Sequence, residues 1–126
     1  MILVGTQLNV SDNSGAKIIE CIKILGKKSS SFASIGDIIV VSVKETTGKS
    51  KQTRKVEKGG IYKALVIETK KGIKRKDGSI LRFHRNSALL LSEQGNPIGT
   101  RILGNGTYEL RKKNQTKVLS LALRVF

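Results

Sequence analysis

The chain has 126 residues, a length typical of one domain with one core, and 38% of them are hydrophobic. Lysine and arginine number 24 against 9 aspartates and glutamates, which gives a formal net charge of +15 at pH 7. A compact protein with this excess needs a polyanionic partner: nucleic acid, an anionic membrane surface or an acidic protein. The longest wholly apolar runs, such as 38–41 and 88–91, have four residues, too few to cross a bilayer. The N-terminus shows the features of neither a secretory signal nor a transit peptide.

Short runs rich in isoleucine and valine, separated by turn-forming residues, predict a β protein. The first run, 6–10, alternates apolar and polar side chains as a half-buried strand does, and a turn follows at 11–15. The run 16–25 favours a strand over a helix, because its isoleucines are β-branched and glycines flank it. Further strands are expected at 37–45, 61–69 and 88–92.

The remaining segments predict a hairpin and a short helix. Residues 73–83 have the pattern of a β-hairpin whose tip is Lys76-Asp77-Gly78. Residues 108–113 favour a helix with Glu109 in its first turn, whereas 116–122 fits a helix or a strand. Five or six short strands with a little C-terminal helix are typical of a small barrel. No linker or repeat divides the sequence, so we expect one mainly β domain over residues 1–126.

The basic residues concentrate in one third of the chain: residues 44–85 hold 14 of the 24 cations and 4 acids. Two clusters neighbour each other in this stretch, and both are candidate RNA-binding sites. The loop cluster consists of Lys44, Lys49, Lys51, Arg54, Lys55 and Lys58. The hairpin cluster consists of Lys70, Lys71, Lys74, Arg75, Lys76, Arg82 and Arg85. Like charges across a hairpin repel each other, and an adjacent phosphate backbone would relieve that repulsion. A membrane is the less favoured partner because the cations lie on strands and turns, not on an amphipathic helix.

The five aromatic residues indicate which kind of RNA is bound. They are Phe32, Tyr62, Phe83, Tyr108 and Phe126. Proteins that bind single strands stack bases on exposed aromatic rings, whereas Tyr62 and Phe83 occupy core-like positions here. We expect the aromatics to be packing residues, and the target to be folded RNA recognised by its phosphates, riboses and shape.

Signals of catalysis are weak. Gly48-Lys49-Ser50 ends like a phosphate-binding P-loop, but Val43 stands where that motif requires glycine. The lone Cys21 and lone His84 do not form a zinc site of familiar spacing, and no third group to orient a Cys/His pair is evident. Cys21 is expected to be a small core residue, and a single thiol fits a reducing compartment. We therefore predict a protein that is not an enzyme and has no cofactor or metal.

Several motifs together are similar to one family over almost the whole chain. They are LNVSDNSGA (8–16), CIK (21–23), GDII (36–39), KG (58–59), TKKG (69–72), DGSI (77–80), RF (82–83), Asn86, PIGTRI (97–102), ELR (109–111) and SLA (120–122). In this order they resemble the family of large-subunit ribosomal protein fourteen in its bacterial and organellar form. No single motif would be specific, but the series is.

The resemblance implies a five-stranded barrel with a projecting β-ribbon, whose tip is Asp77-Gly78, and short C-terminal helices. It further implies direct binding to large-subunit ribosomal RNA and contact with a neighbouring large-subunit protein. Part of the surface would meet the small subunit and its RNA, and a ribosome-silencing factor would dock on the same face. The resemblance places Thr100, Arg101 and Lys117 on that face.

The chain also departs from the family pattern. Leu89 stands where valine is usual, 103–106 replaces a Phe-Gly-Pro type of turn, and Leu123-Arg124 replaces Pro-Glu. With the Lys-, Ile- and Ser-rich composition, these departures slightly favour a ribosome of the mitochondrial matrix over one of a bacterial cytoplasm. Two other hypotheses remain at this point: a free nucleoid-type DNA-binding protein and an RNA-modifying enzyme.

Overall fold

The computed structural model describes residues 2–26, 32–46, 56–99, 102–112, 116–121 and 126. Its strands are β1 (Gln7–Val10), β2 (Ala16–Ile24), β3 (Ile38–Thr46), β4 (Ile61–Glu68), β5 (Ile73–Lys74), β6 (Ile80–Leu81) and β7 (Ser87–Leu91). Two short helices follow, α1 (Tyr108–Lys112) and α2 (Thr116–Leu121). In the part of the chain that the structure describes, no helix is long and apolar enough to span a membrane.

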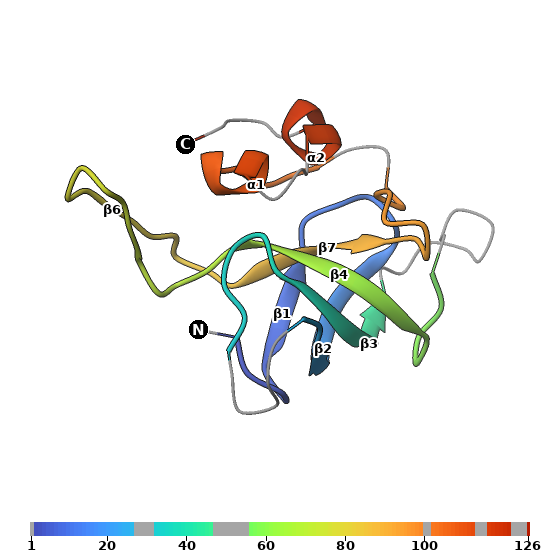
Figure 1. The fold of residues 1–126 in the computed structure, drawn as a ribbon. Coiled ribbons are helices and arrows are strands. Elements are labelled where there is room, and N and C mark those ends of the chain that lie inside the picture. The colour runs from blue at the N-terminus through green and yellow to red at the C-terminus, as the bar shows by residue number, and fades with distance from the viewer. Residues whose placement is uncertain (1, 27–31, 47–55, 100–101, 113–115, 122–125) are drawn as a thin grey trace.

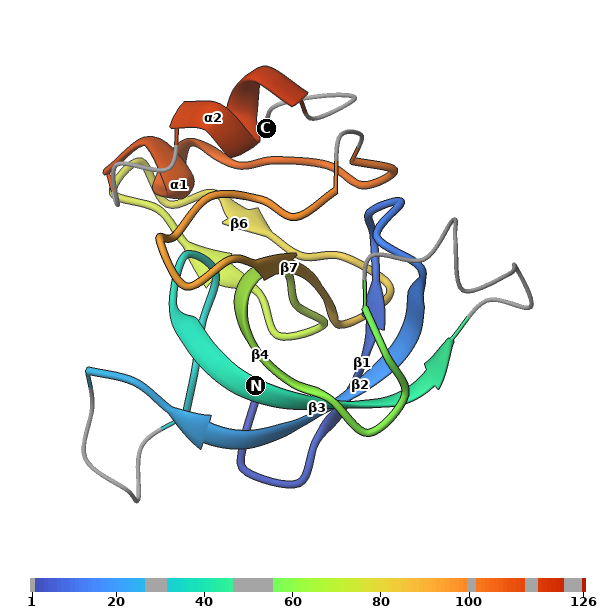
Figure 2. The same cartoon turned by 90° about the vertical axis from the view of Figure 1, so that its right-hand side faces the viewer.

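Five strands close into a barrel in the order β1-β2-β3-β4-β7 (Figures 1 and 2). All neighbouring pairs are antiparallel except β1 and β7, which close the barrel in parallel with Val10 opposite Ala88. Asp12 reinforces this closure, because its Oδ2 accepts a hydrogen bond from the Leu90 amide at 3.1 Å. The predicted five-stranded barrel is therefore confirmed.

Residues 64–67 of β4 and 88–91 of β7 are buried on both faces, which explains their uninterrupted apolar sequences. Val66 and Leu90 belong to the cluster that fills the barrel. Their neighbours Leu65 and Leu89 point the other way, into a second cluster with Leu110 and Val118 from the helices. A strand covered on both faces has no position for a polar side chain, so it loses the alternation of a half-buried strand. The Cys21 side chain is 1% exposed and belongs to the barrel cluster, as predicted, and burial raises the pKa of its thiol.

The predicted hairpin forms a ribbon that projects from the barrel, and its paired strands are shorter than expected (Figure 1). Only Ile73 with Leu81 and Lys74 with Ile80 are in ladder register. At the tip, Asp77 Oδ1 accepts hydrogen bonds from the Ser79 amide at 3.0 Å and the Ser79 hydroxyl at 2.7 Å. These bonds, chiefly that from the hydroxyl, lower the pKa of Asp77. Gly78 adopts a φ of 89°, a left-handed conformation that favours glycine.

The two helices cover one side of the barrel, above β7 in both views (Figures 1 and 2). The helix α1 begins at Tyr108, as predicted, and ends at residue 112. The segment 116–122, which the sequence leaves open, is helical to Leu121. Val118 explains this outcome, because it is 1% exposed and packs on the outer apolar face of β4 and β7.

Candidate nucleic-acid interface

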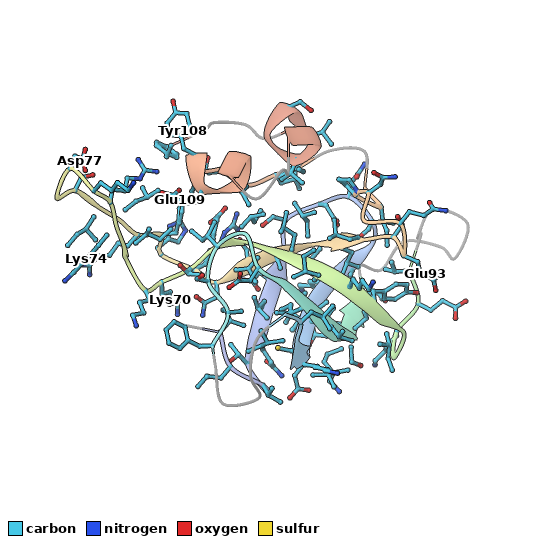
Figure 3. All side chains as sticks on the ribbon, in the orientation of Figure 1. Lys70, Lys74, Asp77, Glu93, Tyr108 and Glu109 are labelled. Carbon is cyan, nitrogen blue, oxygen red and sulfur yellow. The ribbon has the colours of Figure 1, made fainter. Side chains whose placement is uncertain are left out.

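Most lysines of the hairpin cluster are exposed along the ribbon. Lys70, Lys74 and Lys76 all face solvent, as does Arg82 on the return strand. Figure 3 places Lys70 and Lys74 on the side of the ribbon that faces away from α1. Lys71 is also exposed, and its Nζ lies 4.7 Å from the centre of the Phe32 ring. The ribbon therefore presents a row of ammonium groups on a scaffold held by backbone pairing.

Arg75 differs from these lysines because its guanidinium is engaged within the protein. Its Nε donates to Glu109 Oε1 at 3.1 Å and its Nη2 donates to Oε2 at 3.4 Å. Nη2 also donates to the Phe126 carbonyl oxygen, and the guanidinium carbon lies 5.8 Å from the centre of the Tyr108 ring. Figure 3 shows Glu109 between α1 and the ribbon. Arg75 thus joins the ribbon to the C-terminal segment.

This contact favours the ionised form of Glu109. Burial by itself would raise the pKa of this carboxyl group, but hydrogen bonds, chiefly from the Arg75 side chain, hold the pKa below its ordinary value. The Glu109 side chain is 24% exposed and that of Arg75 is 27% exposed, so water screens the pair only in part.

Arg85 is anchored at the base of the ribbon by a buried acid. Its Nε lies 3.2 Å from Glu68 Oε2, and Glu68 is 1% exposed. The other carboxylate oxygen accepts a hydrogen bond from the Asn105 amide at 3.1 Å. A Cβ on Gly104 would lie 2.7 Å from Glu68 Oε1, so a side chain there would have to displace the carboxylate. Glu68 therefore links β4, the ribbon base and the segment 103–106.

The two described members of the loop cluster lie at the other end of β4 from the ribbon. Both are exposed: Lys44, whose Nζ lies 3.3 Å from Glu20 Oε2, and Lys58. Lys44 lies near the end of β3 and Lys58 in the connection between β3 and β4, whereas the ribbon follows the far end of β4 (Figure 1). The eight residues of β4 span about 26 Å. The described residues of the two clusters are thus neighbours in sequence but not in space. Lys49, Lys51, Arg54 and Lys55 lie outside the described residues.

Gly99 and Ile102 flank the segment that the sequence assigns to the subunit interface, and both are described. Thr100 and Arg101 lie outside the described residues, and the side chain of Lys117 on α2 is likewise not described. Gly99 packs so closely on Asp12 that a Cβ there would lie 3.0 Å from the Asp12 Cβ. Ile102 pairs with Asp12 through a backbone bridge and is 3% exposed. Both flanks of the segment are therefore fixed to the turn after β1.

The aromatic residues divide into two groups. Tyr62 and Phe83 are partly buried against the two core clusters, as predicted. Phe32, Tyr108 and Phe126 are 40%, 52% and 39% exposed, respectively, which is more than packing residues require. Each of these three lies next to the ribbon or its base: Phe32 under Lys71, Tyr108 beside Arg75, and Phe126 with its ring centre 6.3 Å from that of Phe83.

His84 is exposed beside the ribbon. Sequence reasoning missed the roles of Glu68 and Asp12. Each is a single acid next to an apolar run, a pattern that also fits an exposed strand end. Among the described residues, no group of three histidine, cysteine or acidic side chains is arranged to hold a metal ion.

The fold and the surface together define the class: a small, basic β-barrel protein with a projecting cationic ribbon, suited to a polyanionic partner. Comparison with known families then gives a specific result. The family model of ribosomal protein L14p/L23e matches residues 1–126, and the chain belongs to this family. It is accordingly a structural constituent of the large ribosomal subunit and is located in the ribosome. The resemblance drawn from the sequence motifs is confirmed.

Proposed function

We propose that the chain binds large-subunit ribosomal RNA directly and that the exposed side of the ribbon makes the main contact. The observation that carries this proposal is the row of exposed cations Lys70, Lys74, Lys76 and Arg82 on one projecting element. Phosphate contacts of this kind position a protein on folded RNA without reading a base code. The loop cluster, whose described members Lys44 and Lys58 lie at the far end of β4, makes a second and separate RNA contact.

Salt titration of the full chain with a large-subunit ribosomal RNA fragment tests this proposal. If about six cations meet phosphates, log K falls against log salt with a slope of roughly −4 to −5. A slope near zero would remove the electrostatic basis of the proposal.

A free DNA-binding protein is the alternative, and sedimentation distinguishes it from a ribosomal protein. The chain should migrate with large subunits after nuclease has removed DNA.

We also propose that the segment around Thr100 and Arg101, with Lys117, takes part in contacts between the subunits. Its support is the unbroken family motif at 97–102, whose flanks Gly99 and Ile102 are fixed to Asp12. The partners are a neighbouring large-subunit protein, small-subunit RNA and a ribosome-silencing factor. The mitochondrial matrix is the proposed compartment, and the chain acts without catalysis, cofactor or membrane.

Large subunits carrying Arg101→Glu test the interface assignment. We expect normal incorporation into the large subunit and weaker joining of small subunits or weaker docking of the silencing factor. A reversed charge at an interface replaces attraction by repulsion and costs about 2–5 kcal/mol where the contact is desolvated. Wild-type affinity in both titrations would place Arg101 away from the interface.

A further inference from the structure

A polar hollow of about 400 Å³ lies where the ribbon leaves the barrel. The exposed face of β1 and the two connections of the ribbon form its walls. Its polar lining consists of Gln7, Asn9, Lys70, His84, Arg85 and Asn86. Leu8 and Ile18 supply the apolar part of the lining. The volume is near the lower end of the range for small-molecule sites, enough for one nucleotide and too small for a paired helix.

Two hydrogen bonds fix the orientation of the polar groups in this hollow. Asn86 Oδ1 accepts from the Lys70 backbone amide at 2.8 Å, which directs the Nδ2 donor the opposite way. Arg85 uses Nε to bind Glu68 at 3.2 Å, so its two terminal nitrogens remain as donors. Glu68 in turn is held by the Asn105 amide. The donors are therefore positioned before any ligand binds.

Three further polar groups of the hollow are open to a ligand. Within the described part of the chain, the side-chain carboxamides of Gln7 and Asn9 and the Lys70 Nζ make no hydrogen bond. Gln7 and Asn9 lie two residues apart on β1, so both side chains project from the same face of the strand. Each carboxamide offers a donor and an acceptor side by side, which is the pattern that matches the edge of a nucleobase.

We propose that this hollow binds one unstacked nucleotide of the ribosomal RNA. The Gln7 and Asn9 amides pair with the base edge, and Lys70 and Arg85 bind the phosphates on either side. Folded RNA offers such nucleotides at bulges and loops, where bases can be turned out of the stack. The inference rests on the proposed RNA binding by the ribbon, and it adds a base-reading site to a surface otherwise limited to phosphates.

The test uses the full chain and two RNA hairpins that differ only in one bulged nucleotide, with 2-aminopurine at the bulge. We expect about 10-fold tighter binding of the bulged hairpin, the scale of one good base-edge contact, and a change in 2-aminopurine fluorescence. The double variant Gln7→Ala/Asn9→Ala should lose the preference and keep its affinity for the paired hairpin. Gln94→Ala, another exposed glutamine, is the matched control and should behave as wild type. Native circular dichroism of each variant establishes that it is folded.

Competition distinguishes the sources of the ligand. A nucleoside 5′-monophosphate should displace the bulged hairpin more effectively than inorganic phosphate, and less effectively than the bulged hairpin itself. Equal displacement by phosphate would overturn the role of the base, and tight binding of the free nucleotide would overturn the assignment to RNA. Equal affinity of wild-type protein for both hairpins, with a normal salt slope, would overturn this inference alone. Loss of salt-dependent binding to either hairpin would instead overturn the proposed function.

Discussion

The two sides of the ribbon use their cations differently. On the side toward α1, Arg75 is engaged by Glu109, by the Phe126 carbonyl and by the face of Tyr108. On the opposite side, Lys70 and Lys74 extend into solvent (Figure 3). The difference follows the chemistry of the side chains, because the planar fork of arginine matches a carboxylate and the ammonium group of lysine is strongly hydrated. A run of cations in a sequence is therefore not one uniform binding surface, and its engaged and its exposed members must be tested separately.

At the ribbon base, Arg85 is also engaged within the protein. Removal of its partner Glu68 should have the largest effect on stability. Glu68→Ala leaves the Asn105 amide without an acceptor and Arg85 without its counter-charge. The Arg85 side chain is 37% exposed and can regain water, so we expect a loss of about 2–3 kcal/mol, measured by urea unfolding.

The control for this variant is Glu93→Ala, which removes an exposed acid. Its change in unfolding free energy should stay within about 0.5 kcal/mol. Equal stability of the two variants would show that the buried acid does not hold the ribbon base.

Substitution of the solvent-facing lysines should act on RNA affinity and not on folding. In the triple variant Lys70→Ser/Lys74→Ser/Lys76→Ser, three phosphate contacts are lost. At about 0.8 logarithmic units per contact, affinity at 0.1 M salt should fall roughly 250-fold, and the salt slope should become shallower by about 2.4. Fluorescence anisotropy with labelled RNA measures both quantities.

Three exposed lysines on the barrel provide the matched control, namely Lys17→Ser, Lys23→Ser and Lys63→Ser together. Their removal lowers the net charge by the same amount, so a non-specific charge effect would reduce RNA affinity equally in both variants. An equal loss would mean that the ribbon is not the binding face.

The sequence predicted the fold well because each barrel strand carries its own local signal. The β-branched run of β2 and the Asp77-Gly78 tip of the ribbon are examples, and both are confirmed. Segment 116–122 remained open because its helix depends on Val118 packing on the outer face of β4 and β7, a contact between distant parts of the chain. The same limit applies to the site. The sequence shows where the cations are. Whether a cation is bound within the protein, as Arg75 is, or exposed, as Lys74 is, depends on where α1 lies.

On the side of the ribbon that faces α1, the strength of the contact between Arg75 and Glu109 can be measured. A double-mutant cycle with Arg75→Ala and Glu109→Ala should give a coupling free energy of about 1 kcal/mol, because the pair is partly buried and has two hydrogen bonds. Glu109→Ala should change RNA affinity far less than the lysine triple variant does. A large loss of RNA affinity would place this side on the RNA as well.

The smallest expected effect is a pH dependence that this contact adds to stability. Because folding lowers the pKa of Glu109, the carboxylate stabilises the protein above its unfolded pKa of about 4.3, and this contribution is lost as pH falls through the folded value. The variant Glu109→Gln keeps the shape of the side chain but does not titrate. Urea unfolding of both proteins between pH 7 and pH 3 should show a constant difference above about pH 5.5, which shrinks at lower pH as the wild-type side chain is protonated. All other acids are common to the two proteins, so their titration cancels in the difference. A difference that stays constant down to pH 3 would show that the charge of Glu109 does not contribute to its contact with Arg75.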